Sequence, residues 1–269
     1  MPHVLAISPH LDDAVLSAGG HLCELASEGV EVSVLTLFAG IPTPPYSLAA
    51  ELLHEEWQLT ENPVHERRIE DAQAVKLLGA KHVHGSFLDV IYRTDSEGQW
   101  LIELGQSPAT HEANQEPELC TRLAESVAEA IGRLRPDHIL TCAAVGEHID
   151  HRRTRDAVLA AATDQVPVSC WEDLPYAHQR AAQPPTLAGG ADFGPPVAEP
   201  AGHEAWEAKY QAIDCYRSQH SMLWPDVEDV CSIFDIHAWQ VAQSHGLTSR
   251  AELFWPVRPA GTRLDDSRV

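Results

Sequence analysis

The sequence predicts an α/β fold with a mostly parallel, Rossmann-like sheet and helices on both of its faces. Short apolar segments of strand character alternate with longer segments of helical spacing along most of the chain. Such alternation is typical of a parallel sheet that is covered by helices. The 269 residues suffice for one large domain whose core needs no disulfide or structural metal. We therefore expect residues 1–269 to form a single domain.

The first half of the chain begins with a strand. Residues 4–8 form an apolar run that ends in a Pro-His turn, and residues 14–27 place apolar side chains on one face of a helix. Gly29 ends this helix, and the second strand is predicted over residues 30–38. The next helix and strand are predicted at residues 64–78 and 83–88.

The second half continues the alternation. A helix over residues 119–134 stops before Pro136, since a helix rarely continues into a proline, and the fourth strand is predicted at residues 138–144. A helix, a strand and two late helices are predicted at residues 150–162, 166–171, 206–219 and 236–244. Two stretches break the rhythm, because residues 92–117 are polar and residues 181–200 are rich in Pro, Gly and Ala. We expect both to be surface loops.

The composition excludes several classes of partner. The formal net charge of -22 disfavours nucleic acid and anionic membranes, because phosphate binding needs a basic face. No segment reaches the roughly 20 apolar residues of a membrane span, and the start of the chain lacks the features of a secretion signal. The six cysteines form no CxxC pair, which indicates reduced thiols. We expect a cytoplasmic protein that binds neither nucleic acid nor membrane, and the sequence leaves open whether it is a homo-oligomer.

Two short patches of histidine and aspartate follow predicted strands, at residues 10–13 (HLDD) and 148–151 (HIDH). In a parallel sheet such strand ends meet at one edge, where ligands gather. Two imidazoles, one carboxylate and a water form a familiar catalytic zinc set, and a further carboxylate can take a proton from that water. Taken singly, Asp12 or Asp13 would also suit the N-cap of the next helix. The residues alone distinguish neither Asp12 from Asp13 nor His148 from His151.

The two patches lie within longer motifs. Residues 8–14 (SPHLDDA), followed by residues 16–20 (LSAGG), resemble the first signature of the PIG-L/LmbE-like zinc-dependent N-deacetylases. His148-x-Asp150-His151 resembles the second signature of that family. Weaker likeness is found at residues 66–71, 77–79 and 209–219. The resemblance covers most of the chain apart from the two predicted loops, and it implies an LmbE-like fold.

The resemblance also implies a role for each residue of the patches. It implies one zinc ion per chain, held by His10, Asp13 and His151. Asp12 would be the general base that deprotonates the zinc-bound water and later serves the leaving amine. His148 would polarise the substrate carbonyl and stabilise the developing oxyanion, with Asp150 holding the ring of His148. The mixed nitrogen and oxygen ligands would also accept iron or cobalt.

Some positions depart from the family pattern. Leu11 stands where the family usually has Pro, and Ala14 where it often has Glu. Gly146 replaces a Tyr that some members place two residues before the first histidine of the second motif, so an oxyanion donor is missing or comes from another segment. Arg68 and Asp89 resemble positions that bind sugar hydroxyls. Each also has a structural interpretation, as a helix-face salt bridge and as a turn cap.

The implied function is removal of an N-acetyl or longer N-acyl group from a glucosamine-type sugar on a natural-product scaffold. The chain looks most similar to soluble bacterial members such as glycopeptide pseudoaglycone deacetylases. Aromatic side chains near the strand ends could stack on such a scaffold or belong to the core or a lid: Trp100, Trp171, Tyr176 and Trp206. An amidase of thiol conjugates is the alternative hydrolase, and a non-hydrolytic nucleotide- or sugar-binding domain is an alternative of another class. The first strand-to-helix turn disfavours nucleotide binding, because it has two carboxylates in place of GxGxxG.

Overall fold

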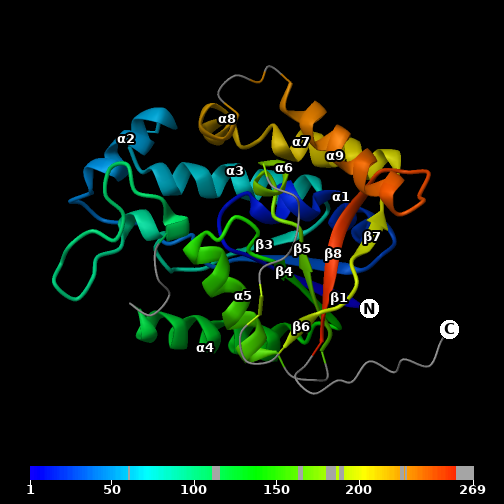
Figure 1. Cartoon of the computed structure of the whole chain (residues 1–269), viewed down its shortest axis with the longest axis horizontal. Coiled ribbons are helices and arrows are strands. Elements are labelled where there is room, and N and C mark those ends of the chain that lie inside the picture. Colours follow the sequence, from blue (N-terminus) through cyan, green and yellow to red (C-terminus); the bar gives the residue numbers. More distant parts are fainter. Residues whose placement is uncertain are drawn as a thin grey trace.

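A mostly parallel sheet forms the centre of the molecule, and helices cover both of its faces (Figure 1). The computed structural model describes residues 1–59, 61–110, 116–162, 166–179, 186–187, 191–224, 227 and 229–258. The strands are β1 (His3–Ser8), β2 (Glu31–Thr36), β3 (Lys81–His84), β4 (His138–Cys142), β5 (Val168–Trp171), β6 (Asp192–Phe193), β7 (Val197–Pro200) and β8 (Ala251–Arg258). Their order is β3-β2-β1-β4-β5-β8-β6, with β7 also paired to β8. The predicted fold class is confirmed.

The helices form two layers. They are α1 (Asp13–Ser27), α2 (Leu48–Glu56), α3 (Pro63–Leu77), α4 (Pro117–Leu134), α5 (Ile149–Ala161), α6 (Tyr176–Gln179), α7 (His203–Ile213), α8 (Arg217–Leu223) and α9 (Val230–Ser244), with short 3-10 turns η1 (Val90–Tyr92) and η2 (Pro108–Thr110). Helices α1, α3, α7 and α9 lie on one side of the sheet, and α4 and α5 on the other (Figure 1). In the part of the chain that is described, no helix is both long and apolar enough to cross a membrane.

Strand β1 shows why its sequence is a continuous apolar run. Val4 and Ala6 pack into the hydrophobic cluster beneath α1 and α3, whereas Leu5 and Ile7 pack against α4 and α5. Successive side chains of a strand point to opposite faces, so a strand covered on both sides must be apolar at every position. β1 pairs in parallel with both β2 and β4. The segments that follow β1 and β4 therefore leave the sheet side by side.

Helix α2 was not predicted, the strand predicted at residues 83–88 lies at Lys81–His84, and three further differences concern the second half of the chain. The helix predicted over residues 206–219 is two helices, α7 and α8, interrupted between residues 213 and 217. The stretch 181–200, predicted as a loop, contains β6 and β7, and its residues 181–185 and 188–190 lie outside the described part. Among the described residues both strands pair with β8, an antiparallel strand that the sequence pattern did not reveal. Their formation depends on a partner more than 50 positions away, for which no local signal exists.

The other predicted loop lies beside the carboxyl ends of the strands. Between η1 and α4, the described residues form one isolated bridge, Thr94 to Trp100, and the turn η2. Residues 111–115 of this stretch lie outside the described part, and Pro117 already begins α4. This segment matters for the site, because it borders the main cavity.

Candidate metal centre and active site

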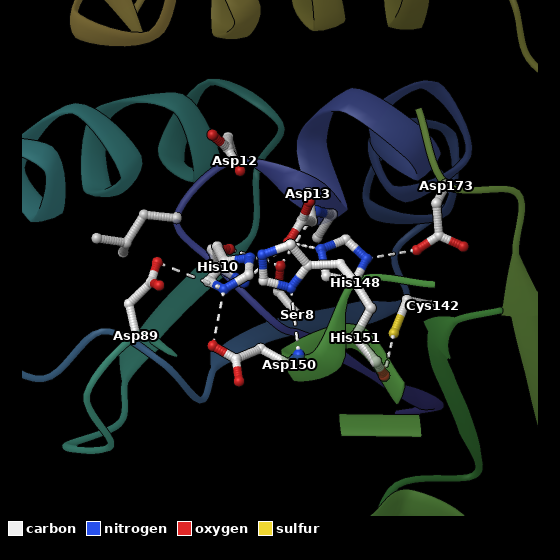
Figure 2. Close-up of polar contacts among 12 residues, drawn as sticks. Ser8, His10, Asp12, Asp13, Asp89, Cys142, His148, Asp150, His151 and Asp173 are labelled. Carbon is white, nitrogen blue, oxygen red and sulfur yellow. Dashed lines mark hydrogen bonds and ion pairs between the residues drawn. The ribbon is translucent and has the colours of Figure 1, made fainter. Parts of the chain in front are cut away.

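The two histidine patches converge at the carboxyl ends of β1 and β4 (Figure 2). The three ring centroids of His10, His148 and His151 lie 4.9, 5.1 and 5.3 Å apart. Asp13 reaches the same place, since its Oδ2 lies 3.3 Å from both His10 Nδ1 and His151 Nε2. All four residues are at least partly buried. The predicted convergence of the two motifs is what the structure contains.

This donor set fits a cation. Nε2 of His151 is completely buried and has no hydrogen-bond partner, although the Asp13 carboxylate lies beside it. Burial alone would lower the pKa of His151, but Asp13 and Asp173 raise it to about 9. The negative field that favours a protonated ring equally favours a metal ion. Nitrogen atoms of His10, His148 and His151 also lie within 4.8 Å of one another, so these positions would allow three imidazoles to share an ion. Both Asp13 and His148 therefore lie within reach of an ion that His10 and His151 would hold.

Asp12 stands apart from the imidazoles. Its carboxylate points toward α3 (Figure 2), where Oδ2 accepts a hydrogen bond of 3.3 Å from Arg67 Nη2. Asp12 makes no side-chain cap of α1, and its φ of 149° is a value that L-residues rarely adopt. Such strain, on the order of 1–3 kcal/mol, is retained mainly at functional sites. Burial and the neighbouring Asp13 raise the pKa of Asp12 to about 7, while Arg67 opposes the rise. A carboxyl of this kind can both accept and release a proton near neutral pH.

His148 is held as a neutral donor. It caps the N-terminus of α5, where its Nδ1 accepts the backbone N–H of Asp150 at 3.2 Å. The proton of a neutral ring must then reside on Nε2. Burial and the nearby His10 and His151 hold the pKa of His148 well below its ordinary value. His148 also lines the cavity, so it can donate a hydrogen bond to a bound molecule.

Asp150 contacts two of the three histidines. The resemblance implied that Asp150 holds the ring of His148, and its backbone N–H does bind Nδ1 of that ring. The carboxylate is fully buried and lies 3.4 Å from His10 Nε2, as Figure 2 shows. It accepts further hydrogen bonds from Val90 N at 2.9 Å and from Arg93 Nη2 at 2.6 Å. Asp150 therefore contacts His148 through its backbone and His10 through its carboxylate.

Asp173 was not identified from the sequence. Its Oδ1 accepts a hydrogen bond from His151 Nδ1 at 2.8 Å, and its Oδ2 accepts the backbone N–H of Val145 at 2.9 Å. This contact fixes the ring so that Nε2 faces the site. The one available signal was a carboxylate just beyond the strand β5, a position shared by many turn residues.

The two predicted sugar contacts have different outcomes. Arg68 does not face the cavity: its Nε donates to His84 Nδ1 at 3.2 Å on the outer side of α3. Its neighbour Arg67 lines the cavity instead. Consecutive residues on a helix point about 100° apart, so a shift of one position changes the face. Asp89 lines the cavity, with Oδ2 3.5 Å from His10 Nε2, and it also caps η1 through the N–H of Ile91.

A cavity of about 730 Å³ opens over these residues. One side is apolar and comes mainly from α2, α8 and the segment before η2; it is formed by Leu52, Leu53, Trp57, Ile102, Leu104, Met222 and Leu223. Of the four aromatic residues considered from the sequence, Tyr176 lines the cavity, whereas Trp171 and Trp206 are core residues. Among the described lining residues there are five carboxylates, one Arg and no Lys.

The ring of Tyr176 occupies the space that a side chain at position 146 would need. A Cβ atom on Gly146 would lie 2.8 Å from the ring of Tyr176, and Gly146 has a φ of +92°. The tyrosine ring also packs edge-on against His151, with centroids 5.5 Å apart. A side chain at position 146 would therefore displace Tyr176 from the cavity wall. Tyr176 of α6 thus places an aromatic side chain at the part of the cavity wall where Gly146 has none.

Comparisons with known proteins agree with this site. The sequence model of the PIG-L family, GlcNAc-PI de-N-acetylase, matches residues 5–162, which include both histidine motifs. The 2'-N-acetylparomamine deacetylase of Niallia circulans is 29% identical over 186 residues, covering 64% of this chain and 67% of that protein.

Solved structures extend the likeness to nearly the whole chain. A zinc-inhibited form of teicoplanin deacetylase has a TM-score of 0.88 at 39% identity, covering 98% of this chain and 100% of the other. A complex of the deacetylase of teicoplanin biosynthesis with teicoplanin has a TM-score of 0.87 at 37% identity, with coverages of 96% and 99%. The A40926 pseudoaglycone deacetylase has a TM-score of 0.83 at 37% identity, with coverages of 97% and 98%. The chain therefore belongs to the GlcNAc-PI de-N-acetylase (PIG-L) family of hydrolytic enzymes.

Proposed function

We propose that this protein is a metal-dependent N-deacetylase that acts on a glucosamine-type sugar carried by a glycopeptide antibiotic scaffold. The observation that carries the proposal is the convergence of His10, Asp13 and His151 close to the carboxylate of Asp12, in a cavity that His10, Asp12 and Asp13 line. Family membership and the deacetylase activities of the similar proteins support the reaction. The glycopeptide scaffold follows from the relatives that cover nearly the whole chain.

His10, Asp13 and His151 would hold one zinc ion per chain. A bound zinc ion lowers the pKa of water and polarises a carbonyl oxygen, which is the chemistry that amide hydrolysis needs. One relative, a teicoplanin deacetylase, is known in a zinc-inhibited form, so the ion that supports turnover here has to be identified by experiment. Iron and cobalt suit the same mixture of nitrogen and oxygen donors.

The remaining residues divide the proton transfers between them. Asp12 accepts the proton of the attacking water and then delivers it to the leaving amine, tasks that suit its pKa of about 7. Arg67 holds the Asp12 carboxylate in place. Nε2–H of His148 donates to the oxygen on which negative charge develops, and the hydroxyl of Tyr176 is the second donor at the cavity wall.

The cavity lining indicates the kind of scaffold. An acetylated amino sugar fills only part of about 730 Å³, which leaves room for a larger group against the apolar side. A phosphate beside the sugar would find one cationic side chain among the described lining residues, Arg67, already paired with Asp12. The lining therefore disfavours a phosphoinositide and suits an uncharged aromatic scaffold. Asp89 remains the proposed contact for a sugar hydroxyl.

The test uses an N-acetylglucosaminyl glycopeptide pseudoaglycone and detects the free amine by mass spectrometry. Turnover should disappear when a chelator removes the metal and return with one equivalent of zinc. Asp12→Asn should keep zinc but lose most turnover, whereas His151→Ala should lose both. Arg68→Ala is the matched control, because that side chain faces away from the cavity. Full turnover by metal-free protein would reject the proposal, and turnover of a thiol-conjugate amide alone would replace its substrate.

A further inference from the structure

A buried cluster of ion pairs extends from His10 to the base of the cavity wall. The Asp150 carboxylate, next to His10, is bound by Arg93 through Nη2 at 2.6 Å and Nη1 at 3.2 Å. The same guanidinium binds Glu116 in a fork, with Nε to Oε1 at 2.9 Å and Nη2 to Oε2 at 3.3 Å. Nη1 of Arg153 contacts Glu116 Oε2 and lies 3.8 Å from Asp150 Oδ1. Two guanidinium groups and two carboxylates thus balance each other; Asp150 and Arg153 are fully buried, and Arg93 and Glu116 are mostly so.

Arg93 and Glu116 stand at the two ends of the segment that forms one side of the cavity. Arg93 follows η1, and Glu116 immediately precedes α4. Between them, residues 102–109 line the cavity. The carbonyl of Arg93 also accepts the N–H of Leu101 at 2.9 Å, directly before this lining stretch. The fork between Arg93 and Glu116 therefore closes the base of the wall.

We propose that Arg93 and Glu116 are positioning residues that fix two things at once: the cavity wall of residues 102–109 and, through Asp150, the ring of His10. The wall would meet the scaffold of the substrate, and His10 would hold the metal. The role given to the scaffold rests on the proposed function. The link between the cavity wall of residues 102–109 and the ring of His10 rests only on the ion pairs of the cluster described above.

The charges explain why the two ends are coupled. Without the negative charge of Glu116, both Arg93 and Arg153 would face the single carboxylate of Asp150. Asp150 would be drawn toward them and away from His10 Nε2, where its hydrogen bond is already long at 3.4 Å. A His10 ring that loses this acceptor is less well oriented and a poorer metal ligand. At the same time the cavity wall would lose the charge-assisted, two-point ion pair between Arg93 and Glu116 at its ends.

The experiment compares Glu116→Gln with Glu118→Gln, an exposed glutamate in the first turn of the same helix. Three quantities are measured: the dissociation constant for zinc by chelator competition, hydrogen exchange at the amide of Leu101, and KM. The KM probes are an N-acetylglucosaminyl glycopeptide pseudoaglycone and free N-acetylglucosamine, which is too small to span the cavity. Glu116→Gln should weaken zinc binding about tenfold. It should also speed exchange at Leu101 and raise KM for the large probe only, while Glu118→Gln changes none of these.

Two further variants keep the test decisive if Glu116→Gln folds poorly. Arg93→Lys retains the charge but cannot reach Asp150 and Glu116 together, so it should reproduce all three effects. Glu116→Asp retains the charge and should stay closer to the wild type in zinc affinity. Wild-type zinc affinity and wild-type exchange at Leu101 in both Glu116→Gln and Arg93→Lys would overturn the proposal. Hydrogen exchange at Leu101 does not depend on turnover, so it tests the ion pair of Arg93 and Glu116 even if neither probe is a substrate.

Discussion

Replacing Asp173 by Asn tests whether this residue sets the chemical form of His151. The Asp173 carboxylate accepts two hydrogen bonds, from His151 Nδ1 at 2.8 Å and from Val145 N at 2.9 Å. An amide offers one acceptor and one donor in their place. If its oxygen serves Val145, its NH₂ group faces Nδ1, and the ring must carry its proton on Nε2, where it cannot bind a metal. If its oxygen serves His151, the buried N–H of Val145 loses its acceptor, at about 1–3 kcal/mol.

Either arrangement weakens the site without changing its shape. We expect Asp173→Asn to bind zinc about 10–100-fold more weakly. Turnover should recover at saturating zinc, because Asp173 does not line the cavity. Chelator competition and a zinc titration of activity measure the two quantities. Asp156→Asn, a carboxylate on α5 that pairs with Arg155, is the control. An unchanged zinc affinity combined with lost turnover would refute the reasoning, since Asp173 would then act on the reaction itself.

Three other perturbations follow from the contacts. Arg67→Met should move the acidic limb of kcat/KM to higher pH, because Arg67 lowers the pKa of Asp12 and the base works when deprotonated; a pH profile measures this. Tyr176→Phe should lower kcat by about 100-fold with zinc content unchanged, the usual loss for one oxyanion donor. Glu252→Leu should lower the free energy of unfolding in urea by about 3–5 kcal/mol, because it leaves the cation of Lys209 buried without its partner at 2.6 Å. The double variant with Lys209→Met should recover the part of that loss that comes from the unpaired cation, but not the part that comes from the N–H groups of Gly20 and His21, which Glu252 also accepts.

Each of these expectations has an opposing outcome. If the acidic limb of kcat/KM is at the same pH in Arg67→Met as in the wild type, Arg67 does not set the pKa of the catalytic base. Full activity of Tyr176→Phe would show that the hydroxyl of Tyr176 takes no part in the reaction. Additive losses in the double variant would show that the buried pair is not coupled.

The metal-binding motifs could be predicted because their signals are local. His10 and His151 each follow an apolar run within a few positions, and a parallel sheet brings such ends together whatever the rest of the chain does. Arg67 and Arg68 could not be separated, because a single step along a helix decides which one faces the cavity. Asp173 and β8 were missed for another reason: each has its role only through a partner far away in the sequence. Tyr176 was among the aromatic residues considered from the sequence, but its place beside Gly146 arises from tertiary packing and could not be predicted.

The antiparallel strand β8 has a consequence for how the protein is made. During synthesis, residues that carry both histidine motifs emerge well before residues 251–258, and until then β5 exposes an unpaired edge. Lys209 likewise waits for its counter-charge, because Glu252 is in that last strand. A ribosome-bound or truncated chain would thus already carry both histidine motifs while the edge of β5 is still open to association with other chains. Pairing of β8 with β5 and β7 is the late step that covers this exposed edge and completes the sheet.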